Sequence, residues 1–375
     1  MIDTGEELTC RMALATYRNI NIETAERFEA LGITATDFFS KSASTLAAIT
    51  QVKQNYFDDE RRAKALASAR QERLFVDGHD IKALYFNEES FPERLLRCVD
   101  GPAMLYAMGN VDAASAKHCI SIVGTRNSTA YGVDFTRRLV EDLAAALDDV
   151  LIVSGLAYGI DIAAHRAALS VGIPTAAVLA HGLNTIYPAD HRNDAREILR
   201  NSGFIATEYC SWQQIHKGNF LARNRIIAGL SDLTIVVESD LKGGAMSTAR
   251  IASAYNRDVM ALPGRINDTY SRGCNELIAN GTAAIVRDAS DVLALMNWKG
   301  REKPGNQKEI SFEIPDRYVP VLDLLRERPD STVNDICVRL NMPFAHISAL
   351  LFQMELEDYV MSLPGGRYTL PSVNH

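Results

Sequence analysis

The segment NFLARNRIIAGLSD, which starts at Asn219, places two arginines and an asparagine directly before an apolar run. Arg223 and Arg225 carry the side chain whose planar fork matches a phosphate, and a helix that is simply buried does not need them at its entrance. Phe220 adds an aromatic face on which a nucleobase can stack. The segment therefore predicts a site for a phosphate-bearing ligand, with Asn224 between the two cations.

The arginines also have a purely structural interpretation. Arg225 can pair with an internal carboxylate, and Glu208 and Glu238 are the candidates. The apolar residues that follow predict a helix leading into a strand, with the arginines at or near the start of that helix. Lys217 lies a few residues earlier and is a further candidate for phosphate contact.

Three glycine-containing loops follow apolar runs and precede helical patterns: IVGTRNSTAYG, IVSGLAYGIDIAAH and LKGGAMSTARIA. Such turns expose backbone N–H groups at the positive end of a helix, which suits an oxyanion. A glycine there is often required only by the turn itself, so both interpretations stay open. None of the loops is G-x-G-x-x-G or a P-loop, so a dinucleotide or ATP fingerprint is absent. The candidate phosphate-binding residues in these loops are Gly124, Thr125, Arg126, Gly155, Gly243 and Gly244.

Short apolar runs alternate with helical patterns through the middle of the chain. Strands this apolar are expected where helices cover both faces of a sheet. We therefore expect an α/β fold with a Rossmann-like, doubly wound, mostly parallel sheet, and a ligand site outside the carboxyl ends of its strands. The runs lie at 120–124, 151–155, 175–180, 204–209, 233–239, 259–264 and 283–288.

The flanks of this region have a different texture. Residues 1–75 are helical in pattern and predict an N-terminal helical domain, and the sheet domain takes 76–298 with a connector at 76–116. Residues 299–311 are a polar linker without periodicity. Residues 312–375 contain three short helical patterns and a hairpin, which predicts a winged helix.

The predicted winged helix is acidic. From Phe312 onward there are 5 arginines and 9 aspartates and glutamates, and the candidate recognition helix at 343–358 contains no Lys or Arg. A helix that reads duplex DNA needs cations beside phosphates, so we expect this helix to contact protein and a transcription factor is disfavoured. The hairpin is expected to turn at Gly365 and Gly366.

Composition limits the remaining possibilities. The chain has 375 residues and 47% hydrophobic content, enough for two or three domains with a sizeable core. Residues 117–288 hold 17 basic and 17 acidic side chains, so the net charge of −8 belongs to the flanks, and a local basic groove is permitted where a broadly basic surface is not. Six cysteines without a C-x-x-C pair, no membrane-length apolar run and an acidic N-terminus predict a cytoplasmic protein without a metal site.

The motifs, in this order, resemble the DprA family (also called Smf), the bacterial DNA-processing proteins of natural transformation. The resemblance runs from about Phe91 to Arg287 and rests on SFPERL, IVGTRNSTAYG, VSGLAYGIDIAAHRAAL, FLARNRIIAGLSD and SRGCNELIANGTAAI. It implies a protein that is not an enzyme, has no cofactor, binds single-stranded DNA without sequence preference, forms homodimers through its Rossmann-like domain and loads RecA recombinase. The residues it implies for the DNA contact are Gly124, Arg126, Lys217, Phe220, Arg223, Asn224 and Arg225.

The sequence also departs from that family. The loop after VVES reads KGGAM where the family has a sequence like S-G-S-L, and RNINIETAERF lacks the glycines of a helix-hairpin-helix or SAM-like domain. The Gly-Gly loop resembles, in addition, the nucleotide site of lysine-decarboxylase-like phosphoribohydrolases. Such an enzyme needs a carboxylate at the anomeric carbon, and Asp161, Glu208 and Glu238 are available. A structural pair of Asp161 with His165, four residues on, is the expected alternative for the first of them.

Overall fold

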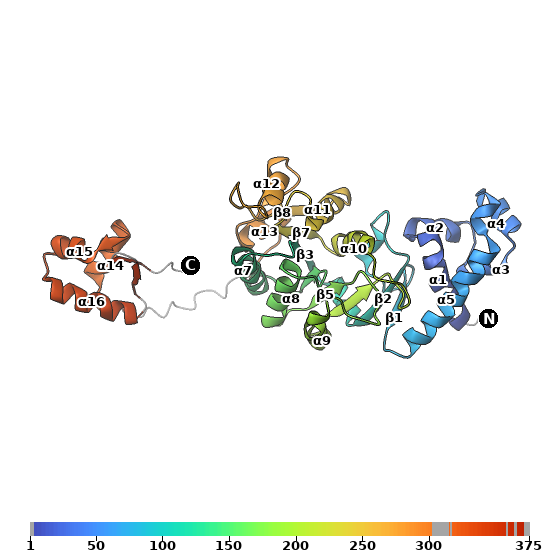
Figure 1. Cartoon of the computed structure of the whole chain (residues 1–375), viewed down its shortest axis with the longest axis horizontal. Helices are drawn as coiled ribbons and strands as arrows, with labels where there is room; N and C mark the ends of the chain where they lie inside the picture. The colour runs from blue at the N-terminus through green and yellow to red at the C-terminus, as the bar shows by residue number, and fades with distance from the viewer. Residues whose placement is uncertain (1–3, 302–314, 316, 358, 364–365, 371–375) are drawn as a thin grey trace. The chain divides into compact units, whose positions relative to one another are not determined.

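The structure is a computed structural model, and it divides into two compact units, Met1–Arg301 and Glu302–His375 (Figure 1). Most of the predicted linker and Gly365 of the predicted hairpin turn lie outside the described residues. The structure describes residues 4–301, 315, 317–357, 359–363 and 366–370.

A 9-stranded sheet forms the centre of the first unit, in the order β1-β2-β6-β5-β4-β3-β7-β8-β9. All neighbours from β6 to β9 are parallel, which confirms the predicted doubly wound, mostly parallel sheet. The strands are β1 (Lys82–Tyr85), β2 (Met104–Gly109), β3 (His118–Gly124), β4 (Val150–Ser154), β5 (Thr175–Val178), β6 (Phe204–Thr207), β7 (Leu233–Val237), β8 (Asp258–Ala261) and β9 (Ala284–Ile285).

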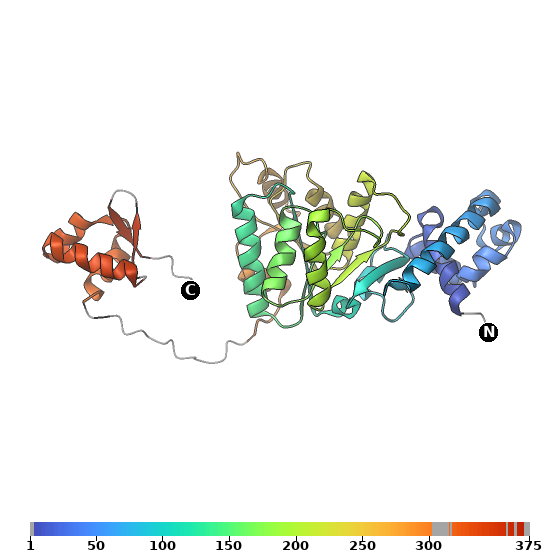
Figure 2. The same ribbon diagram turned by 60° about the horizontal axis from the view of Figure 1, so that its bottom comes forward.

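Helices cover both faces of this sheet (Figures 1 and 2). Because successive side chains of a strand point to opposite faces, Ile120 and Ile122 of β3 pack with one layer, while Cys119 and Val123 pack with the other. The first layer holds α7 (Ala130–Ala146), α8 (Ile160–Ser170), α9 (Arg192–Arg200) and α13 (Ala289–Met296); the second holds α10 (Lys217–Gly229), α11 (Gly244–Ala254) and α12 (Arg272–Ala279).

The predicted connector at 76–116 contributes structure to the sheet. Its strands β1 and β2 pair antiparallel, with Lys82 opposite Ala107, and β2 pairs antiparallel with β6. The connector also contains the short helix α6 (Glu93–Leu96) and the 3-10 helix η3 (Val111–Ser115). No helix in the described ranges is long and apolar enough to cross a membrane.

The N-terminal helices share one hydrophobic core with the sheet, which joins Phe38 of α3 to Leu105 of β2. Between the first two helices, Arg18 and Asn19 both have a φ of 53°, a left-handed conformation that side chains rarely adopt and that glycine usually provides. The elements are α1 (Thr4–Thr16), η1 (Tyr17–Asn19), α2 (Ile22–Ala30), α3 (Ala35–Ser40), α4 (Ala43–Thr50), η2 (Gln54–Phe57) and α5 (Asp59–Asp77).

The second unit is a winged helix, as predicted, with its own core around Tyr318, Ile336 and Leu351. A small antiparallel sheet in the order β10-β12-β11 accompanies its helices. The elements are α14 (Val319–Glu327), β10 (Ser331–Thr332), α15 (Val333–Leu340), α16 (Phe344–Leu356), β11 (Met361–Leu363) and β12 (Arg367–Thr369).

Candidate nucleic-acid interface

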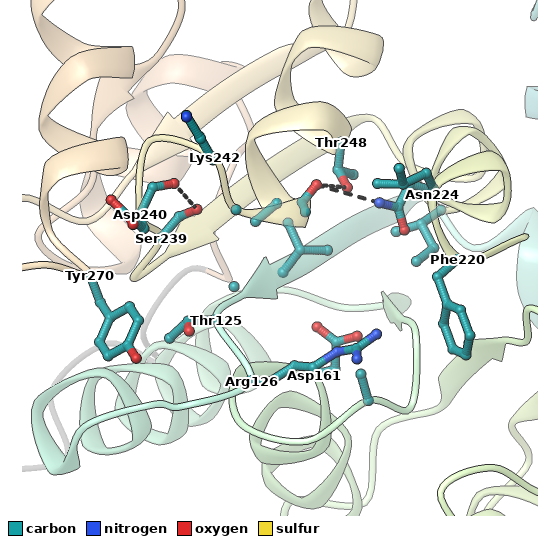
Figure 3. A pocket seen from close by; sticks show the side chains of 18 of the residues that line it. Thr125, Arg126, Asp161, Phe220, Asn224, Ser239, Asp240, Lys242, Thr248 and Tyr270 are labelled. Atoms are coloured by element: carbon teal, nitrogen blue, oxygen red, sulfur yellow. Dashed lines mark hydrogen bonds between the residues drawn. The ribbon is translucent and has the colours of Figure 1, made fainter. Parts of the chain in front are cut away.

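A cavity of about 370 Å³ opens at the point where the strand order reverses. The chain proceeds from β3 to β6 on one side of β3 and then returns to its other side with β7, so the carboxyl ends of β3 and β7 diverge into a crevice. The loops after β3 and β7, the start of α8 and one side of α10 line it (Figure 3). The predicted residues among its lining are Gly124, Thr125, Arg126, Phe220, Arg223, Asn224, Gly243 and Gly244.

The loop after β3 holds Arg126 at the mouth of this cavity. The loop lies close against its neighbours, because a Cβ on Gly124 would meet the Val237 carbonyl oxygen at 2.0 Å and one on Gly159 would meet the Thr125 carbonyl oxygen at 2.1 Å. The exposed guanidinium of Arg126 lies over the ring of Phe220, 5.2 Å from its centroid. A cation and an aromatic face, drawn from segments 94 positions apart in sequence, therefore meet where a nucleotide can reach both.

Arg223 is buried beneath the cavity, with 4% of its surface exposed. Its Nη1 donates to the Gly155 carbonyl oxygen at 2.8 Å and to the Val178 carbonyl oxygen, which joins the ends of β4 and β5. Gly155 has a packing role here, because a Cβ at that position would lie 2.4 Å from the same Nη1. The arginine fork thus holds strand ends, and its position under the cavity floor supplies positive charge to a ligand above it.

Asp161 is the buried acidic residue of the cavity lining and lies at the start of α8, close to Arg126 in Figure 3. Burial raises the pKa of its carboxyl, and the nearby charge of Arg223 opposes that rise. Burial also lowers the pKa of Arg223 to about 10, with the charge of Asp161 acting against it. The two groups therefore stabilise each other's charged forms in a desolvated site.

The N-terminus of α11 points backbone N–H groups at the cavity. Gly243 is the residue before the helix and Gly244 the first within it, and no side chain caps this end. Gly243 lacks room for a side chain, since a Cβ would meet Ser239 Oγ at 2.3 Å, whereas Gly244 faces open space. Asn224 Nδ2 donates to the Gly244 carbonyl oxygen at 3.4 Å, which ties α10 to α11 (Figure 3). An uncapped helix end of this kind favours an oxyanion.

The N-terminus of α7, by contrast, already has an anion from the protein itself. The Glu238 carboxylate accepts from Thr129 N at 2.8 Å and from Thr129 Oγ1. Glu238 follows β7 with a φ of 57°, and a Cβ on Gly132 would meet its Oε2 at 2.3 Å. Of the two helix N-termini that follow β3 and β7, the one of α11 is therefore the one that is left to bind a phosphate.

The helix α10 begins at Lys217, so the prediction that the arginines stand at its start is wrong; they lie in its middle. Lys217 is exposed and is not part of the cavity lining. Arg225 Nη2 bonds Glu208 Oε2 at 2.5 Å, which confirms the structural interpretation of this arginine, and it faces another hollow. Arg225 projects from a different side of α10 than Phe220 and Asn224, which line the cavity.

We expect Arg225→Ala to lower the free energy of unfolding by about 1–3 kcal/mol, because it leaves the partly buried Glu208 carboxylate without its partner. Affinity for a ligand in the cavity should change by no more than about 2-fold. Denaturant unfolding and binding titrations on the same preparation measure both. The double variant Arg225→Met with Glu208→Met serves as a control and should recover part of the lost stability. A large loss of affinity at unchanged stability would contradict this assignment.

Several cavity residues were missed in the sequence. Lys242 is exposed and directly precedes the predicted Gly-Gly pair, a position that could have indicated it, whereas Tyr270 comes from a loop after β8 and only the folded chain brings it to the cavity. The predicted pairing of Asp161 with His165 is wrong, because His165 is buried and its Nδ1 is hydrogen-bonded to Thr175 Oγ1 at 2.7 Å. The other missed lining residues with polar side chains are Ser239, Asp240 and Thr248.

Two family descriptions match the chain: "DNA recombination-mediator protein A" over residues 82–297 and "DprA winged helix domain" over residues 313–366. The chain is 35% identical to Protein Smf of Escherichia coli over 294 residues, 77% of each protein. It is 33% identical to Protein Smf of Synechocystis over 331 residues, 78% of this chain and 82% of that protein.

Two solved structures, both of a DNA processing protein A, are similar to this one. DNA processing protein A of Streptococcus pneumoniae matches with a TM-score of 0.64 at 30% identity, covering 78% of this chain and 98% of the other. DNA processing protein A of Helicobacter pylori, solved for its single-stranded DNA binding mode, matches with a TM-score of 0.52 at 33% identity, covering 58% and 95%. On the sheet topology, the switch-point cavity and these matches, the chain belongs to the DprA (Smf) family of DNA-processing proteins.

Proposed function

We propose that this protein binds single-stranded DNA without sequence preference, with one nucleotide seated in the switch-point cavity. The observation that carries the proposal is the stack of Arg126 on Phe220 at the mouth of a cavity whose other wall is the uncapped N-terminus of α11. A base can stack on the aromatic ring while its phosphate meets the guanidinium and the helix N–H groups. Bases of a duplex are stacked inside and cannot enter.

The proposal assigns each group a task. Arg126 and Lys242 are the exposed cations of the lining and take phosphate oxygens, and Phe220 takes a base. Arg223 and Gly155 hold the floor of the cavity in position, and the Arg223 guanidinium contributes positive charge without direct contact. Such contacts read no base edge, which makes the binding independent of sequence.

The proposed function does not include catalysis. The carboxylates considered for N-glycosidic hydrolysis lie apart: Asp161 faces the switch-point cavity, Glu238 caps α7, and Glu208 pairs with Arg225. Asp161 is held near the charges of Arg223 and Arg126, which favour its ionised form. A rate test with nucleoside monophosphates should give no turnover above the buffer control.

A salt series tests the binding proposal. For a labelled dT oligomer of about 5 residues, two cations engaged with phosphates predict a slope of log affinity against log salt of about −1.4. Fluorescence anisotropy with the full chain measures the slope, and a duplex of the same length is the control. Affinity that is independent of salt, or equal for the duplex, would refute binding in this cavity.

As the resemblance implies, we also propose that the protein forms homodimers through its sheet domain and helps to load RecA recombinase onto the bound strand. The acidic winged helix suits a protein contact better than a duplex: α16 contains no Lys or Arg and leaves Phe344, Phe352 and Leu356 exposed. Sedimentation of the chain, and RecA filament assembly on coated strands with and without it, test these two proposals.

A further inference from the structure

Trp212 lies in the loop between β6 and α10 with 47% of its surface exposed. The loop is fixed by Glu72 of α5, which is buried to 3% exposure and accepts from Ser211 N at 2.8 Å and from Ser211 Oγ at 2.6 Å. Burial raises the pKa of the Glu72 carboxyl, and the bonds from Ser211 oppose that rise. A desolvated carboxylate therefore holds in place a large aromatic ring that faces solvent.

Trp212 lines a hollow of about 510 Å³. Its cations are Arg18, Arg61 and Lys64, all exposed, and its carboxylates are Asp58 and Glu60. Asp58 is engaged in capping α5, where it accepts from Arg61 N at 2.7 Å. In the described part of the chain, neither Arg61 nor Lys64 forms an ion pair. The Arg18 guanidinium is held over the ring of Tyr56, 5.0 Å from its centroid, at the left-handed turn of Arg18 and Asn19.

Trp212 also lines a second hollow, of about 760 Å³, that is rich in amides. Part of it is the opposite side of α10 from the switch-point cavity, so the width of this helix separates the two sites. Amides can donate to and accept from base edges without adding charge. The residues lining this second hollow are Asn19, Asn21, Asp100, Glu208, Tyr209, Trp212, Gln213, Gln214, Asn219, Ala222 and Arg225.

We propose that Trp212 is a second base-stacking platform, which takes the stretch of single strand that leaves the switch-point cavity around α10. Phosphates of that stretch meet Arg61 and Lys64, and the amides of the second hollow, which both donate and accept, meet the edge of any base and select none. The combination of an exposed, fixed indole with unpaired cations fits an unstacked strand, whereas a duplex presents no base to the ring. The inference rests on the proposed function, since the strand arrives from that cavity.

Fluorescence tests the platform directly, because the chain has 2 tryptophans. Trp298 packs against His118 with ring centroids 4.4 Å apart, and Trp298→Phe leaves Trp212 as the reporter. A dT oligomer of about 20 residues is expected to quench this emission by stacking, in step with the binding seen by anisotropy. Binding by anisotropy without any change in Trp212 emission would overturn the inference.

Substitutions separate this inference from the proposed function. Trp212→Ala should weaken binding of the longer oligomer by at least about 5-fold and that of a 5-mer by less than about 2-fold, and Trp212→Phe should restore most of the difference. Arg61→Ala with Lys64→Ala should flatten the salt slope of the longer oligomer by about 1.4, whereas Arg196→Ala with Arg200→Ala on α9 should leave it unchanged. If the Trp212→Ala chain does not fold, the Trp212→Phe variant and the double variant Arg61→Ala with Lys64→Ala decide the question.

The outcomes are distinguishable. If the wild type binds neither oligomer, the proposed function fails. If it binds both and the Trp212 and Arg61–Lys64 variants match it at both lengths, the second platform alone is wrong.

Discussion

Arg223→Met is expected to lower the free energy of unfolding of the sheet unit by about 3–5 kcal/mol, the largest effect of any substitution considered. The substitution removes the donors that join the Gly155 and Val178 carbonyl oxygens, and both acceptors remain buried. It also removes the charge that compensates Asp161 in a desolvated site. Denaturant unfolding followed by tryptophan emission measures the loss, since Trp212 and Trp298 both lie in this unit.

A double variant distinguishes the charge from the packing contribution. Asp161→Asn added to Arg223→Met removes the uncompensated carboxylate and should regain about 1–2 kcal/mol relative to Arg223→Met alone. Arg223→Lys keeps the charge and loses the fork, so it should fall between the wild type and the methionine variant. A single-variant loss below about 1 kcal/mol would show that the guanidinium is not a structural tie.

Arg126→Ala is expected to weaken binding of single-stranded DNA by about 10- to 100-fold, with the melting temperature unchanged. A charge-assisted contact to phosphate is worth about 1.5–3 kcal/mol, and the cover over Phe220 is lost with it. The side chain is exposed, so its removal leaves no buried group without a partner. Anisotropy across a salt series should also show the slope shallower by about 0.7.

The matched control for Arg126 is Arg250→Ala. Arg250 is an exposed cation on α11, the helix whose N-terminus borders the cavity, but it does not line the cavity. Its removal tests whether general positive charge explains the affinity. Equal losses for the two variants would mean that DNA is held by the surface as a whole and not by the cavity.

The strands of the sheet were predictable where the sequence is continuously apolar, because burial on both faces imposes that pattern. The runs at 120–124 and 233–239 became β3 and β7 with small changes at their ends. The strands β1 and β2 were missed, since they lie in a segment interrupted by prolines and glycines, and β2, which carries β1, joins the sheet only by pairing with β6, about 100 residues later. Non-local pairing leaves no local signal.

The sequence predicted several residues of the site, but not which group each of them contacts. An arginine before an apolar run predicts phosphate contact, yet Arg223 bonds carbonyl oxygens and Arg225 bonds Glu208. Both outcomes depend on which groups the folded chain brings near, and a guanidinium serves an internal acceptor as well as an external one. Arg126 and Phe220, both predicted to contact the ligand, do lie together, because a loop and one side of a helix converge at the cavity mouth.

The ends of the nine-stranded sheet have a consequence for assembly. One outer strand, β1, is 4 residues long, and the other, β9, is 2 residues long. Neither offers another chain an extended row of free backbone donors and acceptors, and so the molecule is protected from growing by strand addition. Copies that associate through this unit are therefore expected to meet through side-chain surfaces and not by joining their sheets edge to edge.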